Sequence, residues 1–354
     1  MRKRRLTIVG VVLALVAAVA IGVVVWQRQD RTDLERALEF LPGETMRVAW
    51  TDWHGVRDEL GADVDADSPG EDAQKLVDDG FEPDLTSGSA MVQSALALHE
   101  KFGFSPASVE WEALGQSDEG AVVALRLADD ADFDELAKNL VALGYTDPAE
   151  EDGVWQGGID LMPKIDPSLN PEFQYVALLA DERMVLTSDE STYLETALET
   201  AKGDHDSLES VDDVASVAAA AGDAVSGVLM QGEHACQALA MSQADSEDQR
   251  IAEDLVADAG DVNPLTGFLL ASQPGGEIRA VLGFEGDDQA EANTESRRRL
   301  AEGPAPGQGG DFSERFSVES AEQDGRNVVL TLDPVEGEYV VSDLSHGPVL
   351  FATC

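Results

Sequence analysis

The chain has few cysteines, histidines and basic residues, and each shortage excludes a class of function. Its 354 residues include two cysteines and five histidines, and no two histidines have the i, i+4 spacing of a zinc-hydrolase helix. Lysine and arginine total 23 against 70 acidic residues, which gives a formal net charge of −47. The one basic cluster beyond the N-terminus, residues 297–299, lies in an acidic segment. Because such a chain repels phosphate backbones, we exclude nucleic acid as a partner.

The familiar catalytic motifs are also missing. The sequence contains no Gly-x-Ser-x-Gly elbow, no Ser-x-x-Lys with a Lys-Thr-Gly element, and no GxxxxGK[ST] phosphate loop. Carboxylates are too numerous for one pair to stand out as a glycosidase dyad. The sequence therefore offers no catalytic residue, and whether the protein is an enzyme stays open.

One long apolar segment is present, LTIVGVVLALVAAVAIGVVVW at residues 6–26, directly after the basic residues 2–5. Its 21 residues span roughly 30 Å as a helix, which matches the hydrocarbon core of a bilayer. Trp26 ends the segment, where aromatic side chains favour the membrane interface. The pattern predicts a transmembrane anchor, so the lipid bilayer is an expected partner.

The flanking charges predict the orientation of this anchor. Positive charge stays on the cytoplasmic side, so the basic tail lies inside the cell membrane and the C-terminal domain is extracytoplasmic. All acidic residues follow the anchor. A cleaved signal peptide is the alternative, because Ala18 and Ala20 have the spacing that signal peptidase accepts. Both alternatives place the mature domain outside the cytoplasm.

The cysteines, Cys236 and Cys354, allow a single intramolecular pairing. Exported proteins keep disulfides, and this one would close a loop that contributes about 4–5 kcal/mol in the chain-entropy model. It would also hold the C-terminal residue, where chain ends otherwise fray. We predict this disulfide, and two separate thiols are the alternative.

Apolar periodicity predicts an α+β ectodomain in which helices cover antiparallel sheets. Short apolar and β-branched runs between turn residues indicate strands at residues 46–50, 121–127, 153–156, 175–179, 184–187, 265–272, 277–285, 316–322 and 327–332. Apolar residues three and four apart indicate helices at residues 33–40, 52–60, 88–102, 129–145, 190–202, 286–300 and 336–344.

The order strand, helix, strand, strand, helix occurs twice, at about residues 121–202 and 277–346. This recurrence suggests two related units within one elongated ectodomain. The predicted organisation is a cytoplasmic tail (1–5), the anchor (6–26), a stalk (27–35), a mostly helical part (36–119), a first α+β unit (120–222) and a second α+β unit (223–354).

Three alternating aspartates form the best candidate for a metal site: Asp63, Asp65 and Asp67. Alternation aims carboxylate oxygens at one point, which suits Ca²⁺. Compared with an EF-hand loop, Ser68 stands where glycine is needed, and Gln74 stands where a bidentate glutamate is needed. A solvated acidic loop is the alternative, and no other cofactor is expected.

Three segments look familiar together: LEFLPGETMRVAWTDW (38–53), DVNPLTGF (261–268) and PVLFATC (348–354). In this order they resemble a family of uncharacterised single-pass envelope proteins of actinobacteria, which have a basic tail, one anchor and an exported domain. The resemblance implies location, topology and an α+β ectodomain. It transfers no site residue.

We expect a non-enzymatic domain that binds a partner or ligand in the cell envelope, because a large exported domain lacks a catalytic pattern. Exposed apolar positions of the 88–102 helix or of the sheets in the two repeated units would contribute to its interface. One alternative is an envelope hydrolase, which two converging carboxylates or a histidine beside a serine in a pocket would favour. The other is a calcium-responsive surface protein. The acidity itself has a simpler explanation in a GC-rich genome or adaptation to salt.

Overall fold

The computed structural model describes residues 31–150 and 152–354. The predicted tail and anchor, residues 1–26, lie outside these ranges. Within them, no helix is long and apolar enough to cross a membrane. The predicted α+β class, with antiparallel strands and packed helices, is confirmed.

The strands of the described residues form one sheet of eleven, in the order β10-β11-β9-β8-β7-β1-β2-β3-β6-β5-β4. Every neighbouring pair is antiparallel. The strands are β1 (Arg47–Asp52), β2 (Val109–Gln116), β3 (Ala121–Leu127), β4 (Trp155–Gln156), β5 (Tyr175–Leu179), β6 (Met184–Ser188), β7 (Ser226–Gln231), β8 (Gly267–Ser272), β9 (Ile278–Gly283), β10 (Phe316–Asp324) and β11 (Asn327–Pro334). The sequence suggested several sheets, and the structure forms a single one.

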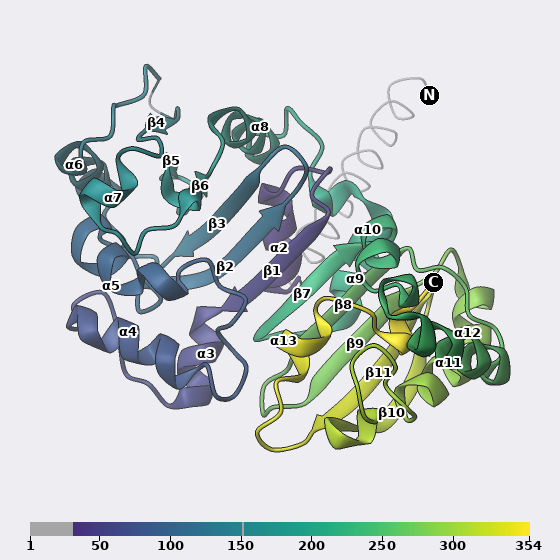
Figure 1. Ribbon diagram of the computed structural model, residues 1–354. Coiled ribbons are helices and arrows are strands. Elements are labelled where there is room, and N and C mark those ends of the chain that lie inside the picture. Colours follow the sequence, from purple (N-terminus) through teal and green to yellow (C-terminus); the bar gives the residue numbers. More distant parts are fainter. Residues whose placement is uncertain (1–30, 151) are drawn as a thin grey trace, which may run out of the picture.

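The strand order repeats on the two sides of the β1–β7 pair, with the earlier strands in purple to teal and the later ones in green to yellow (Figure 1). β1, β2, β3, β6 and β5 follow one another outward on one side, and β7, β8, β9, β11 and β10 do so on the other. A helix follows the third strand each time, α6 (Phe133–Leu143) after β3 and α12 (Asp287–Ala301) after β9. We call residues 47–188 the N-terminal half and residues 226–354 the C-terminal half.

Three helices cover one face of the sheet across both halves: α2 (Asp33–Ala37), α8 (Ser191–Ala201) and α9 (Asp212–Ala221). α9 lies very close to the strands, because a Cβ atom at Gly283 would stand only 2.9 Å from Val217 Cγ2. The same valine methyl would lie 3.0 Å from a Cβ at Gly267. Glycine and alanine therefore allow this face to close into one continuous core.

The other face carries two separate apolar cores, one on each half. The N-terminal core packs beneath α3 (Trp53–Leu60), α4 (Gly70–Asp79), α6 and α7 (Met162–Ile165). The C-terminal core packs beneath α10 (Gly232–Ala238), α11 (Ser246–Ala259), α12 and α13 (Val340–Leu344). The two cores meet above β1 and β7, and we call this boundary the seam.

The chain is bonded into the body from Arg31 onward. The Arg31 guanidinium forms ion pairs with Glu39 and with Glu209, the latter at 3.1 Å. Thr32 caps α2 by accepting from the backbone N–H of Glu35, whose carboxylate accepts from the Thr32 N–H at 2.8 Å. Both orphan donors are satisfied in this capping box.

The predicted strands at 265–272 and 277–285 pair as the hairpin β8–β9, and those at 316–322 and 327–332 pair as the hairpin β10–β11. Two strands were missed. β2 contains Glu110 and Glu112, so its alternation does not stand out from the surrounding acidic sequence. β7 follows the alanine-rich run of α9, and that run concealed the start of a strand.

The predicted helix at 88–102 is not continuous. It is a 3₁₀ turn (Val92–Ser94), α5 (Ala95–Ala97) and a π turn (Leu98–Phe102). Its predicted apolar face is nevertheless buried, through Met91, Ala95, Leu98 and Phe102. Leu96, at 37% exposed, is the large apolar side chain that this segment leaves for an interface.

Candidate functional site

The candidate site is a pocket of about 250 Å³ at the seam. β1 and β7 form its floor, residues 84–88 form one wall, and residues 341–346 form the other. The polar side chains that line the walls and floor are Arg47, Asp84, Ser87, Ser226, Ser342, Ser345 and His346. Sites between two packed units commonly bind ligands, so this seam pocket is the natural place to look for function.

A buried glutamate of β2 holds the first wall. Glu112 is 1% exposed, and its carboxylate accepts hydrogen bonds from the Ser89 hydroxyl and the Ala90 N–H, both at 2.6 Å. Trp53 Nε1 donates to the same carboxylate at 3.1 Å. Burial raises the pKa of Glu112, and these donors act in the opposite direction. The bonds fasten the chain directly after the wall at residues 84–88.

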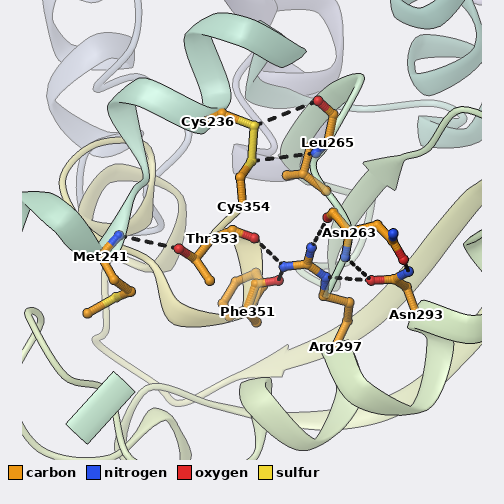
Figure 2. The surroundings of a disulfide bond; sticks show 9 residues. All are labelled: Cys236, Met241, Asn263, Leu265, Asn293, Arg297, Phe351, Thr353 and Cys354. Carbon is orange, nitrogen blue, oxygen red and sulfur yellow. Dashed lines mark hydrogen bonds between the residues drawn. A yellow bond between two sulfur atoms is a disulfide. The ribbon is translucent and has the colours of Figure 1, made fainter. Parts of the chain in front are cut away.

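A buried arginine of α12 holds the second wall. Arg297 is fully buried, and its Nη1 donates to the carbonyls of Phe351 and Thr353 at 3.0 and 2.6 Å (Figure 2). Nη2 donates to the carbonyl of Asn263 at 2.5 Å. Burial lowers the pKa of Arg297 to about 9, so the guanidinium keeps its proton at neutral pH. It binds the chain end that continues from the second wall.

The predicted disulfide between Cys236 and Cys354 is confirmed. It joins α10 to the last residue, with the two Cα atoms 5.4 Å apart, and lies beside the Arg297 bonds (Figure 2). Phe351, between the arginine contacts and the core, is fully buried. Covalent bond, charge and apolar side chain thus fix the C-terminal segment onto the C-terminal core.

The two walls contact each other directly across the seam. Asp84 accepts from the Ser342 N–H at 2.9 Å and from the Ser342 hydroxyl. The Ser87 hydroxyl lies 2.6 Å from that of Ser342. Outside the pocket, the rings of Phe81 and Tyr339 lie 5.5 Å apart. Asp84 has a left-handed backbone with φ of 58°, a conformation that non-glycine residues seldom adopt and that often marks functional sites.

The seam pocket places a histidine beside a serine, which bears on the hydrolase alternative. Ser345 Oγ lies 3.3 Å from His346 Nδ1, but the same hydroxyl also donates to the Ser342 carbonyl at 3.0 Å. Asp84, the carboxylate of the pocket, binds Ser342 and Ser87 and not His346. A nucleophilic serine needs a base that a third group orients, and this arrangement does not supply one.

Arg47 of β1 is the cation of the pocket floor. Its Nη1 donates to Gln116 Oε1 at 2.9 Å, and it forms no ion pair with any carboxylate among the described residues. Burial lowers the pKa of Arg47, and its charge in turn contributes to lowering the pKa of His234 after the larger effect of burial. The pocket lining therefore contains one cation, Arg47, and one carboxylate, Asp84, within a chain of net charge −47.

The calcium candidates lie on the surface and away from this pocket. Asp63, Asp65 and Asp67 are exposed. Asp65 Oδ1 already accepts from the Asp67 N–H at 3.0 Å and from the Ser68 hydroxyl at 3.1 Å. Within residues 31–150 and 152–354, no group of three or more His, Cys, Asp or Glu side chains is arranged to hold a metal ion. Calcium binding at these aspartates stays a prediction.

Two larger cavities differ from the seam pocket in the charged residues that line them and in the ion pairs that these residues form. A cavity of about 480 Å³ beside α2 contains Arg31, Arg36 and Arg126, each of which pairs with a carboxylate. A groove of about 530 Å³ near Asp65 and Asp67 is lined chiefly by acidic and apolar residues.

Sequence reasoning missed the charged residues that build the seam pocket. In the sequence, Arg297 is one of three consecutive arginines in an acidic segment, and nothing there distinguishes it from its two neighbours. Arg298 and Arg299 do pair with Glu295, at 2.8 and 2.9 Å, whereas Arg297 is buried. Glu112 alternates with Trp111 and Ala113 as a residue of a two-sided strand does, but the surrounding acidic residues hide this pattern in the sequence.

No family model matches the chain, and no curated protein matches it. A solved structure described as "Structure of crystal form I of TP0453" aligns with 87% of this chain and 96% of its own, at 8% identity and a TM-score of 0.38. A TM-score this low does not establish a shared fold.

Proposed function

We propose that the protein is a membrane-anchored, extracytoplasmic binding protein without catalytic activity, which holds a small ligand in the seam pocket. The single observation behind this proposal is that the two buried charges, Glu112 and Arg297, each bind the segment that follows one wall of the same pocket. Buried charges are costly, so their placement at both walls supports a pocket whose shape matters.

The size and lining of the pocket support a small ligand. A volume of about 250 Å³ is below the roughly 300–1,000 Å³ of pockets for drug-sized molecules. Leu85 and Val341 supply apolar surface, and the serine hydroxyls supply donors and acceptors. The hydroxyl of Ser345 is committed to a backbone carbonyl, which favours binding over nucleophilic catalysis.

The envelope location rests on the predicted anchor at 6–26, and the resemblance to single-pass actinobacterial envelope proteins supports it. Protease treatment of intact cells tests the location, with tags at both ends of the chain. We expect digestion of the acidic domain and protection of the N-terminal tag. Protection of both tags until lysis would overturn the proposed location.

The binding proposal is tested by filling the pocket. Gly88 has room for a side chain, since a Cβ there would stand 3.6 Å from Ala49 Cβ. Gly88→Leu places an isobutyl group in the pocket, and Gly286→Leu, where nothing lies within 4 Å, is the matched control. Native mass spectrometry of the full chain, purified in detergent from its own membranes, should show a small-molecule adduct that Gly88→Leu loses. An adduct that both variants retain, or no adduct in the wild type, would contradict the proposal.

A further inference from the structure

The cation in the seam pocket differs from the other arginines near cavities. In the cavity beside α2, Arg36 lies 2.6 Å from Asp33, and Arg126 lies 3.4 Å from Asp129. Those charges are already neutralised by neighbours on the surface. Arg47 has no such neighbour among the described residues, although it is only partly exposed.

The position of Arg47 in the sheet aims it at the pocket. On β1 it stands between Gln116 of β2 and Met230 of β7. Met230 belongs to the core of the C-terminal half on this face, whereas Val48, the next residue of β1, belongs to the opposite face. A guanidinium has five N–H donors, and the neutral amide of Gln116 accepts from one of its nitrogen atoms.

The carboxylate in the same pocket is engaged elsewhere. Asp84 accepts from Ser342 and, at 2.9 Å, from the Ser87 hydroxyl, so its charge holds the two walls together. A partly buried guanidinium without a carboxylate loses hydration and gains little in return. An anion that enters the pocket would supply the missing interaction.

We infer that Arg47 binds the carboxylate of a small organic acid, which is the ligand class of the seam pocket. This inference rests on the proposed binding function. One guanidinium matches one carboxylate in charge and in planar, two-point geometry. A phosphate dianion fits less well, because the pocket offers no second arginine or lysine. Leu85 and Val341 would contact the carbon chain of the acid.

The test uses the full chain in detergent micelles and three probes: butyrate, its uncharged isostere butyramide, and inorganic phosphate. Saturation-transfer NMR titrations measure binding to the wild type, to Arg47→Met and to Arg250→Met. Arg250 is exposed on α11, so its variant removes the same charge outside the pocket. Arg47→Lys keeps the positive charge and removes the planar, two-point donor geometry of the guanidinium. Thermal unfolding checks that each variant is folded.

Butyrate should bind the wild type and Arg250→Met alike, and Arg47→Met should weaken it about 10- to 100-fold, as expected for hydrogen bonds to a charged group. Arg47→Lys should bind with intermediate affinity. Equal binding of butyramide, unchanged binding to Arg47→Met, or binding of phosphate alone would overturn the inference. If Gly88→Leu loses the native adduct while Arg47→Met keeps it, the pocket binds a ligand but not through this charge.

Discussion

The two halves of the molecule repeat one strand order, yet they hold their walls of the seam pocket with opposite charges. In the N-terminal half, the Glu112 carboxylate accepts from backbone N–H groups at the start of a run of helical turns. In the C-terminal half, the Arg297 guanidinium donates to carbonyls at the end of the 3₁₀ turn Leu350–Ala352. Helix starts leave N–H groups unpaired and helix ends leave carbonyls unpaired, so the sign of each charge follows from the end that it meets.

The halves also differ in the number of interactions that hold the segment after each wall. The first wall is followed by a segment that Glu112 binds through the Ser89 hydroxyl and the Ala90 N–H. The second wall is followed by a segment that Arg297 binds through two backbone carbonyls. The Cys236–Cys354 disulfide joins this second segment to α10 as well. The second wall therefore has a covalent restraint in addition to its buried charge.

Removing the disulfide should have the largest effect on stability, and it should loosen the second wall but not the first. Replacing Cys236 and Cys354 by serine should lower the free energy of unfolding by about 4 kcal/mol, because the sequence separation of 118 residues closes a long loop. Urea denaturation of the full chain measures this loss. Hydrogen exchange should rise at residues 340–353 and stay unchanged at residues 84–91. Equal increases at both walls would contradict the asymmetry.

Removing the buried cation should have the next largest effect. Arg297→Met leaves the carbonyls of Phe351, Thr353 and Asn263 without a partner and should lower stability by about 3 kcal/mol. Arg298→Met removes a surface charge from the same helix and should cost less than about 1 kcal/mol. Urea denaturation compares them, and similar losses for both would show that burial of Arg297 is unimportant.

Glu112→Gln tests the buried carboxylate of the N-terminal half through the pH dependence of stability. The folded pKa of Glu112 is raised by burial, so its ionised form is disfavoured in the fold. The stability of the wild type, relative to the glutamine variant, should therefore fall as pH rises from about 4 to 7. Each unit of raised pKa corresponds to about 1.4 kcal/mol of this change. Denaturation series at several pH values measure it, and parallel curves would mean that Glu112 does not titrate differently in the fold.

The smallest effect is expected from the contact that joins the walls. Ser342→Ala removes a hydroxyl that bonds Asp84 and Ser87 and should cost about 1 kcal/mol. Exchange should rise modestly at both walls, unlike the one-sided effect of the disulfide. Ser317→Ala, on the exposed strand β10, is the control. Unchanged exchange at residues 84–91 would show that the Ser342 hydroxyl does not help to hold the first wall.

Much of the fold followed from sequence pattern, because the hairpins around Pro274 and Asp324 combine turn residues with apolar strands. The buried face of residues 88–102 also followed from spacing, although the helical turns there change pitch. The disulfide was predicted because two cysteines allow a single intramolecular pairing, and the structure decides between that pairing and two separate thiols.

The seam pocket could not be predicted from the sequence, for a physical reason. Pattern rules assign charged residues to the surface, and Glu112, Arg297 and Arg47 are charged residues at interior or partly buried positions. Their hydrogen-bond partners are backbone groups and uncharged side chains, so no opposite charge marks these residues in the sequence. The close pairing of β1 with β7, far apart along the chain, is equally hidden from local periodicity.

The ion pairs of Arg31 with Glu39 and Glu209 have a consequence for the proposed membrane anchor at residues 6–26. If that anchor is embedded in lipid, only residues 27–30 separate it from Arg31. Four residues extend at most about 14 Å. Under this proposal the folded domain would stay close to the membrane surface, and a ligand of the seam pocket would be bound there.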